Sequence, residues 1–435
     1  MIKAGVSEVN ITPPVGISMC GFAGRKGPSE SVHDELFARA LVLDNGETQV
    51  AIVGADVISF APDLVARIRK LVAEATGILE GHVLLNGSHT HSGPTVMAFR
   101  CMGDRDEAYE DVLCRKVVGA IVMAVDNVEP AVLSLGRAPV RIAYNRRELR
   151  DGRIVLGHHP NGPEAPWVDV LRVNREDETP LAVVFVTASH PVNLSSLVIS
   201  AEFPGYAAQF VRENLGGAMP LFLQGCCGDI NCSPKDKTFE CTQRLGALLG
   251  AAAVTAAINA QPIEGGVLAV ENRRVELPLM IPDVDVAAKA YEDATVGLER
   301  AREDKAITPY QLRQRFEGSV GWAEDYVKAS REGGKPTQAF EIQAILIGNM
   351  AVVGYPGEMF VDYQLSLEEG SPFDRTFAVA YSNGCIGYVP TADAYPAGGY
   401  EVEQAFKYYG TLMIGSESEA LIKTATIDIL NTLRK

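Results

Sequence analysis

Apolar runs alternate along this chain with stretches of helical periodicity. Gln49 to Phe60 and Leu181 to Val186 are nearly continuous apolar runs, which are typical of strands covered on both faces. Pro62 to Ala75 and Glu107 to Val128 carry apolar residues at helical spacing, which predicts helices. Because strands and helices alternate, we predict an α/β fold, a layered α/β/α domain with a central mixed sheet that spans residues 1–435 as a single unit.

The same alternation continues through the second half of the chain. We predict strands over 221–224, 339–353 and 376–381, and helices over 205–214, 242–258 and 417–433. Residues 282–335 differ, because the two helical stretches within them are charged and polar on most faces. We interpret them as a helical hairpin inserted in the domain, laid over the α/β body and roofing the site as a mobile lid.

Composition narrows the range of partners. The formal charge of −16 and the lack of a Lys/Arg cluster argue against nucleic acid and anionic membranes, because both attract positive charge. The chain shows neither a membrane-spanning apolar run nor a signal peptide, so we expect a cytoplasmic protein without stable membrane association that acts on a small-molecule substrate. The oligomeric state stays open, with a homo-oligomer among the options.

A His-x-His motif follows the apolar run that ends at Leu85. In extended backbone the side chains repeat every two residues, so His89 and His91 would point to the same side and could meet one metal ion. The alternative is that one imidazole bonds to local backbone while the other is a surface group. Further metal-capable residues at later strand ends favour the metal interpretation.

Those later residues stand where each of the other apolar runs breaks. They are His190 after 181–186, Asp229 and Asn231 after 221–224, Glu358 after 339–353, and Tyr388 after 376–381. Ligands of open α/β sheets bind beyond the carboxyl ends of the strands, so we expect these side chains to converge. Taken singly, each has a plainer explanation as a turn residue or a buried tyrosine.

Together these segments resemble the neutral/alkaline ceramidase family. The matching motifs are Ala4 to Gly16, His33 to Ala40, Ser88 to Pro94, His190-Pro191, Gly228-Asp229-Ile230, Pro356-Gly357-Glu358 and Gly387 to Thr391. They occur in the family's order and run over nearly the whole chain. The resemblance implies a zinc hydrolase that cleaves the amide bond of N-acyl sphingosines.

The resemblance also implies a set of zinc ligands. The family's two histidines, glutamate and tyrosine match His89, His190, Glu358 and Tyr388. Imidazole nitrogens, a carboxylate and a phenolic oxygen are donors that suit Zn²⁺, which polarises a carbonyl group and lowers the pKa of its bound water. Whether the chain has a second metal site is left open.

Three further residues are implied to act on the substrate. The family's second loop histidine matches His91, its carbonyl-contacting tyrosine matches Tyr400, and its substrate-facing arginine matches Arg146. His91 would move the proton to the leaving group, while Tyr400 or Arg146 would stabilise the oxyanion. From their residue type alone, Asp229 and Asp169 are candidates to orient the ligating histidines from behind.

The chain departs from the family at the serine that serves there as nucleophile or orients water. Asn231 fills the matching position, and Asn cannot accept an acyl group. Either Ser233 is shifted into place by an insertion, or metal-activated water attacks directly while Asn231 orients it or the substrate. We favour direct attack by water, with Cys232 as a remote third nucleophile.

The second departure concerns length. Secreted ceramidases carry an export signal and a further β-sandwich domain, and this chain shows neither. We therefore expect a zinc-dependent hydrolase of a small soluble amide, lactam, lactone or ester, with amides favoured over esters. The alternatives are a true ceramidase, a metal-dependent lyase or isomerase acting next to a carbonyl, and a silent metal-binding protein.

Overall fold

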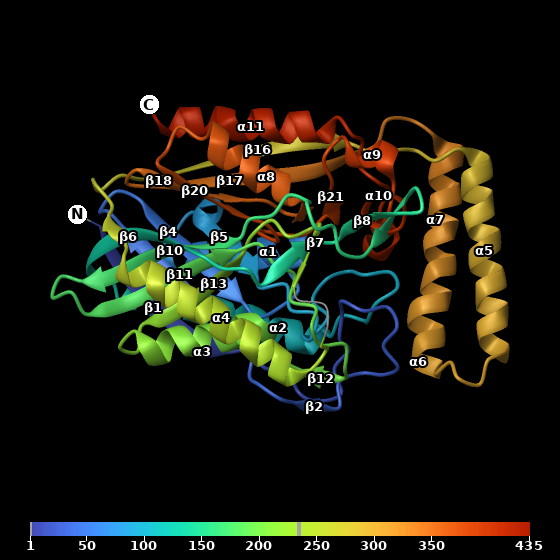
Figure 1. Ribbon diagram of the computed structural model, residues 1–435, viewed down its shortest axis with the longest axis horizontal. Helices are drawn as coiled ribbons and strands as arrows, with labels where there is room; N and C mark the ends of the chain where they lie inside the picture. Colours follow the sequence, from blue (N-terminus) through green and yellow to red (C-terminus); the bar gives the residue numbers. More distant parts are fainter. Residues whose placement is uncertain (1, 233–235) are drawn as a thin grey trace.

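The central layers are two β-sheets. The computed structural model describes residues 2–232 and 236–435, and it has the predicted α/β fold with a central mixed sheet (Figure 1). The larger sheet has the order β13-β11-β10-β6-β1-β3-β4-β5, with β15 paired to β6. Its strands are β1 (Lys3–Asn10), β3 (Phe37–Asp44), β4 (Gln49–Ala55), β5 (Val83–Gly87), β6 (Glu129–Pro139), β10 (Trp167–Arg175), β11 (Pro180–Thr187), β13 (Met219–Gln224) and β15 (Gln261–Pro262).

A smaller sheet and several two-stranded pairs complete the β-structure. The smaller sheet has the order β16 (Leu268–Pro278), β17 (Thr337–Ile347), β18 (Met350–Gly354), β20 (Arg375–Val379). The pairs are β2 (Ser31–Val32) with β12 (Val198–Ile199), β7 (Ala143–Asn145) with β14 (Ile230–Cys232), β8 (Arg147–Arg150) with β9 (Arg153–Leu156), and β19 (Glu358–Met359) with β21 (Tyr388–Val389).

Helices cover both sheets. They are α1 (Pro62–Thr76), α2 (Glu107–Asp126), α3 (Glu202–Asn214), α4 (Phe239–Ile258), α5 (Val284–Glu303), α6 (Pro309–Gln311), α7 (Gly318–Glu332), α8 (Val361–Gly370), α9 (Ala394–Ala397), α10 (Tyr400–Glu403) and α11 (Ser418–Leu433), with short helical turns η1 (Glu80–His82), η2 (Leu312–Glu317) and η3 (Ala405–Tyr409). In Figure 1, α11 lies over the smaller sheet, while α3 and α4 lie along the opposite side of the molecule.

Helix α4 is long and apolar enough to cross a membrane by length and composition alone. Half of its apolar window is buried, and it packs against α3, β6 and β10. Leu245, Leu249 and Ala253 point into the core between this helix and the larger sheet. The apolar character of α4 is therefore explained by its place in the core.

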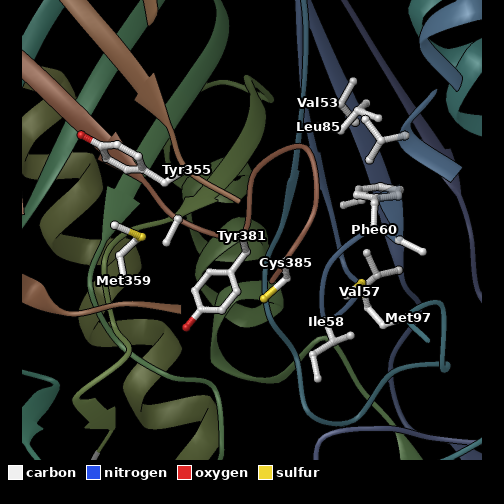
Figure 2. Close-up of a cluster of buried hydrophobic side chains, with 14 of the residues drawn as sticks. Val53, Val57, Ile58, Phe60, Leu85, Met97, Tyr355, Met359, Tyr381 and Cys385 are labelled. Atoms are coloured by element: carbon white, nitrogen blue, oxygen red, sulfur yellow. The ribbon is translucent and has the colours of Figure 1, made fainter. Parts of the chain in front are cut away.

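The continuous apolar run of β4 is buried on both faces of the sheet. Val50 and Ile52 belong to one buried cluster, whereas Ala51 and Val53 belong to another. Alternate side chains of a strand point to opposite faces, so a strand covered on both sides needs apolar residues at every position. Figure 2 shows Val53 and Leu85 stacked above Phe60 in the second of these clusters.

The strands that lead to the predicted site form parallel pairs. These pairs are β4 with β5, β11 with β13, and β18 with β20. Asn86, in β5, joins the carboxyl ends of three strands. Its Nδ2 donates to the carbonyl of Ala380, which follows β20 (2.6 Å), and its Oδ1 accepts from the amide of Gln224, which ends β13 (2.9 Å). The carboxyl ends of β5, β13 and β20 are therefore fixed to one another.

The helical segment within 282–335 stands at one end of the molecule. α5 packs on α7 and η2 and lies on the outer side of α7 in Figure 1. The hairpin does not lie over the sheets as a roof. It reaches the body through loops: Gln311 Nε2 donates to the Gly24 carbonyl (3.0 Å), and the Trp322 ring packs against Phe406 at a centroid distance of 5.8 Å.

Candidate active site

Two imidazoles and a carboxylate meet beyond the carboxyl ends of β5, β11 and β18. The Nε2 atoms of His89 and His190 lie 3.1 Å apart, and His190 Nε2 lies 3.1 Å from Glu358 Oε2. His89 Nε2 lies 3.6 Å from the same carboxylate oxygen. All three side chains are at least 97 % buried, so the strand ends bring these predicted ligands into one enclosed cluster.

Main-chain carbonyls orient both histidines. His89 Nδ1 lies 2.8 Å from the Ile58 carbonyl oxygen, and His190 Nδ1 lies 2.6 Å from that of Cys227. A carbonyl oxygen only accepts, so each Nδ1 carries the proton and each Nε2 presents a bare lone pair. Burial lowers the pKa of His190 to about 4, so this ring is neutral at neutral pH.

The His-x-His motif lies in a turn, not in the extended backbone that we expected. His89 has a left-handed φ of +62°, and its amide donates to the Val57 carbonyl at 3.0 Å. Such a conformation costs about 1–3 kcal/mol for a non-glycine residue and persists only where its surroundings hold it. The two imidazoles still meet, with His91 Nε2 3.2 Å from His89 Nε2.

His91 therefore joins the same cluster. The ligand atoms of His89, His91 and His190 all lie within 4.8 Å of one another, so these three histidines could hold a metal ion together. Burial, followed by the nearby His89 and His190, keeps the pKa of His91 well below its usual value. Its Nδ1 has no hydrogen-bond partner in the part of the chain that the structure describes.

Glu358 lies in β19, directly opposite Tyr388 of β21. Two tyrosine hydroxyls that sequence reasoning did not select also donate to its carboxylate: Tyr381 to Oε2 at 3.3 Å, and Tyr409 to Oε1. Burial alone would raise the pKa of Glu358, but the neighbouring imidazoles of His190 and His89 hold that pKa well below its usual value. Glu358 is therefore an anion at neutral pH.

Arg146 crosses the side of the cluster near Tyr388. Its Nη2 donates to the Tyr388 hydroxyl (3.0 Å), its Nη1 to Asn231 Oδ1 (3.1 Å), and its Nε to Glu401 (2.9 Å). Burial would lower the pKa of Arg146, but Tyr388 and Glu401 raise it well above its usual value. Tyr400 lies next to this group, with its ring edge-on to Tyr388 at a centroid distance of 5.7 Å.

Within the described residues, Asp229 forms no hydrogen bond with a histidine, which corrects the expectation that it orients one. Its Oδ1 accepts from the Val361 amide (2.8 Å) and its Oδ2 from Asn145 Nδ2 (2.8 Å). Asp169 instead pairs with Arg137 through both carboxylate oxygens at 2.7 Å. The carbonyl groups behind the histidines already accept their Nδ1 protons, which leaves no role there for a carboxylate.

Of the two candidates for the position of the family's serine, the structure describes only Asn231. This residue lies in β14, next to His190 in an isolated parallel bridge, and its side-chain oxygen faces Arg146. Ser233, the alternative, lies outside the described residues. Among the residues that sequence reasoning missed, Tyr381 could have been found because it directly follows the β20 region, whereas Tyr409 stands in η3 with no motif around it.

Residues 18–26 and Tyr409 of η3 contact this cluster, and the helical hairpin packs against these two segments. Gly21 touches His91 so closely that a Cβ there would lie 2.5 Å from the imidazole Cγ. The Phe22 ring lies 5.1 Å from the His91 ring, and Arg25 Nη2 donates to the His91 carbonyl (2.5 Å). We call residues 18–26, η3 and the helical hairpin the cover, and the strand ends that carry His89, His190 and Glu358 the floor.

Comparisons with known proteins identify relatives of this chain. Residues 2–221 match the family described as "Neutral/alkaline non-lysosomal ceramidase, N-terminal". The neutral ceramidase of Pseudomonas aeruginosa is 22 % identical over 496 aligned positions, which cover 100 % of this chain and 72 % of that enzyme. Neutral ceramidase B of Dictyostelium discoideum is 23 % identical over 238 positions, covering 50 % of this chain and 32 % of its relative.

The fold has a solved counterpart. The crystal structure of the neutral ceramidase from Pseudomonas aeruginosa superposes with a TM-score of 0.75 at 19 % identity, over 100 % of this chain and 74 % of that one. A segment of the neutral ceramidase of Drosophila pseudoobscura pseudoobscura is 34 % identical, but it covers only 21 % of this chain and 14 % of that enzyme. The likeness in sequence and fold thus extends over the whole chain.

Proposed function

Because the chain belongs to the neutral/alkaline non-lysosomal ceramidase family, we propose that it is a metal-dependent hydrolase that cleaves the amide bond of a ceramide-type N-acyl substrate. The relatives named above are ceramidases, which supports this over the small soluble substrate that the sequence alone favoured.

The geometry of three side chains supports a bound metal ion. The unprotonated Nε2 atoms of His89 and His190 face each other at 3.1 Å, and the ionised Glu358 lies 3.1 Å from one of them. Two lone pairs and a carboxylate cannot hydrogen-bond to one another, and burying them without a cation is unfavourable. Nitrogen and oxygen donors at this spacing suit Zn²⁺, with Tyr388, which lies opposite Glu358, as the candidate for a further ligand.

A bound zinc ion would polarise the substrate carbonyl and make water acidic enough to attack it at neutral pH. The chain's own groups supply the remaining steps. His91, neutral and buried beside His89, takes a proton from the attacking water and passes it to the leaving amine. The guanidinium group of Arg146, next to Tyr388 and Asn231, stabilises the negative charge that develops on the carbonyl oxygen.

The test is a substrate panel with site variants. Zinc-loaded protein is incubated with short- and long-chain N-acylsphingosines and with soluble amides, lactams and lactones, and acid and amine release are followed by mass. We expect N-acylsphingosine turnover that falls at least about a thousandfold in His89→Ala and in Glu358→Ala. The control is His158→Ala, because His158 is exposed.

Each outcome tests a different part of the proposal: the site, the substrate, the type of reaction or the metal. Full activity in both site variants would contradict the proposed site. Turnover confined to soluble amides would contradict the ceramide-type substrate while keeping amide hydrolysis. A product that does not contain the mass of one added water would point to a lyase or isomerase. A wild-type protein that does not bind zinc, or two variants that bind zinc as tightly as wild type, would contradict the proposed metal site.

A further inference from the structure

The two oxygens of Glu358 have different surroundings. Oε2 faces the histidines, 3.1 Å from His190 Nε2 and 3.6 Å from His89 Nε2. Oε1 is turned the other way and accepts a hydrogen bond from the Tyr409 hydroxyl. A carboxylate can bind a metal through one oxygen or through both, and here only one oxygen is directed towards the histidines.

Tyr409 is held firmly in this position. Its ring lies against Gly387, where even a Cβ atom would come within 3.1 Å of the tyrosine Cδ2. The Phe99 ring meets it edge-on at a centroid distance of 5.3 Å, and the Arg100 amide donates to the carbonyl of the preceding residue, Tyr408 (2.9 Å). The absence of a side chain at Gly387 thus makes the space that lets Tyr409 reach Glu358.

The segment that carries Tyr409 belongs to the cover and not to the floor. Within η3, Phe406 packs against Trp322 and Tyr326 of α7, at centroid distances of 5.8 Å and 6.0 Å. Tyr409 therefore provides a hydrogen bond from the cover to a carboxylate of the floor. Because the hydroxyl donates its hydrogen to Oε1, that oxygen already has a partner on the side away from the histidines.

We propose that Tyr409 is a positioning residue whose hydrogen bond to Oε1 restricts Glu358 to one-oxygen contact with the metal, leaving a coordination position free for water or the substrate carbonyl. The inference rests on the proposed function. A hydrogen-bonded second oxygen fixes the ligand's orientation, and removing such a partner changes metal-site properties by about 10–100-fold in comparable sites. A free Oε1 would instead turn towards the metal and fill that position.

The test removes only the hydroxyl. In Tyr409→Phe we expect kcat to fall about 10–100-fold with KM within about twofold, and zinc affinity, measured by competition with a chelator, to stay the same or tighten. With Co²⁺ in place of zinc, the visible d–d bands should weaken, since absorption falls as coordination number rises. Tyr395→Phe is the control, because Tyr395 donates to the Ile414 carbonyl (2.8 Å) away from the cluster.

Two results would overturn the proposal. Zinc affinity that weakens about tenfold or more, with the zinc-loaded variant retaining its kcat, would mean that Tyr409 merely helps to hold the metal. A cobalt spectrum and a kcat that both equal those of wild type would mean that the hydroxyl has no role. The cobalt spectrum and the zinc affinity need no substrate, so an unchanged spectrum, or an affinity that weakens about tenfold, contradicts this inference even if the proposed amide substrate is wrong.

Discussion

The floor and the cover of the site are built in different ways. In the floor, main-chain carbonyls hold His89 and His190, and buried hydrogen bonds tie the strand ends together. In the cover, side chains join loops across the surface: Thr308 donates to the Lys26 carbonyl (2.9 Å), and the Ser18 and Tyr310 hydroxyls lie 3.1 Å apart. Buried main-chain contacts fix geometry more firmly than exposed side-chain contacts do.

This difference separates two properties of the site. The floor sets which atoms face the metal, and changes there should cost stability or metal binding. The cover sets what lies against His91 and Glu358, so changes there should alter turnover with little effect on the fold. Variants at single positions on each side test this separation.

Within the floor, the largest effect is expected at Asn86, which joins the strand ends. Asn86→Ala removes the acceptor of the buried Gln224 amide and one of two donors to the buried Ala380 carbonyl, which keeps the Ser382 hydroxyl (3.2 Å). Leaving the buried amide without its acceptor should lower the free energy of unfolding by about 2 kcal/mol, measured by urea denaturation. Asn161→Ala, at an exposed position, is the control. A loss below about 1 kcal/mol would show that Asn86 is not what joins these strands.

In the cover, Gly21→Ala should damage turnover while leaving metal binding intact. A Cβ at Gly21 would strike the His91 ring, and its φ of +96° is unfavourable for alanine. A displaced His91 should lower kcat about 10–100-fold at unchanged zinc stoichiometry. Gly24→Ala is the matched control, because a Cβ there meets nothing within 4 Å. Loss of zinc in Gly21→Ala would contradict the separation of floor from cover.

Sequence reasoning predicted the floor much better than the cover. His89, His190 and Glu358 each follow an apolar run, and strand ends meet in an α/β sheet, so period and position sufficed to place them. The left-handed backbone of His89 was not predictable in this way. It depends on the Val57 carbonyl, and although histidine is enriched at positive φ, only a small minority of histidines adopt it.

The cover escaped prediction because its contacts join distant segments without a periodic pattern. Polar helices over 284–302 and 309–331 were expected, but their place beside the body, not over it, is set by contacts such as Trp322 with Phe406. Tyr409 likewise reaches Glu358 only because Gly387 leaves room for it. Asp229 shows the reverse error, since a motif position was assigned a role that main-chain carbonyls already fill.

The buried carboxyl group of Glu202, at the start of helix α3, should make the free energy of unfolding depend on pH. The buried carboxyl of Glu202 accepts from the Ser92 hydroxyl (3.0 Å) and the Asn193 amide (2.9 Å), and burial raises its pKa to about 8. A raised folded-state pKa means that this stabilisation is complete below about pH 4.5 and is lost as pH rises through 8. As the pH rises from about 5 to about 9, the free energy of unfolding of wild type should therefore fall relative to that of Glu202→Gln.

The measurement is the free energy of unfolding of both proteins at each pH. Glu213→Gln, an exposed glutamate of the same helix α3, is the control and should follow wild type at every pH. A constant difference between wild type and Glu202→Gln across this range would contradict the raised pKa of Glu202.

The smallest effect is expected at the surface of the cover. Asp325→Asn removes the partner of Arg100, and both side chains are about half exposed, so the free energy of unfolding should change by less than about 1 kcal/mol. Glu401→Gln provides the contrast, because Glu401 is fully buried between Arg146 and Arg147 and its loss should cost about 3–5 kcal/mol. Urea denaturation at low and high salt measures both. Equal losses in the two variants would mean that the cover is held as firmly as the interior, and the contrast between the two sides of the site would fail.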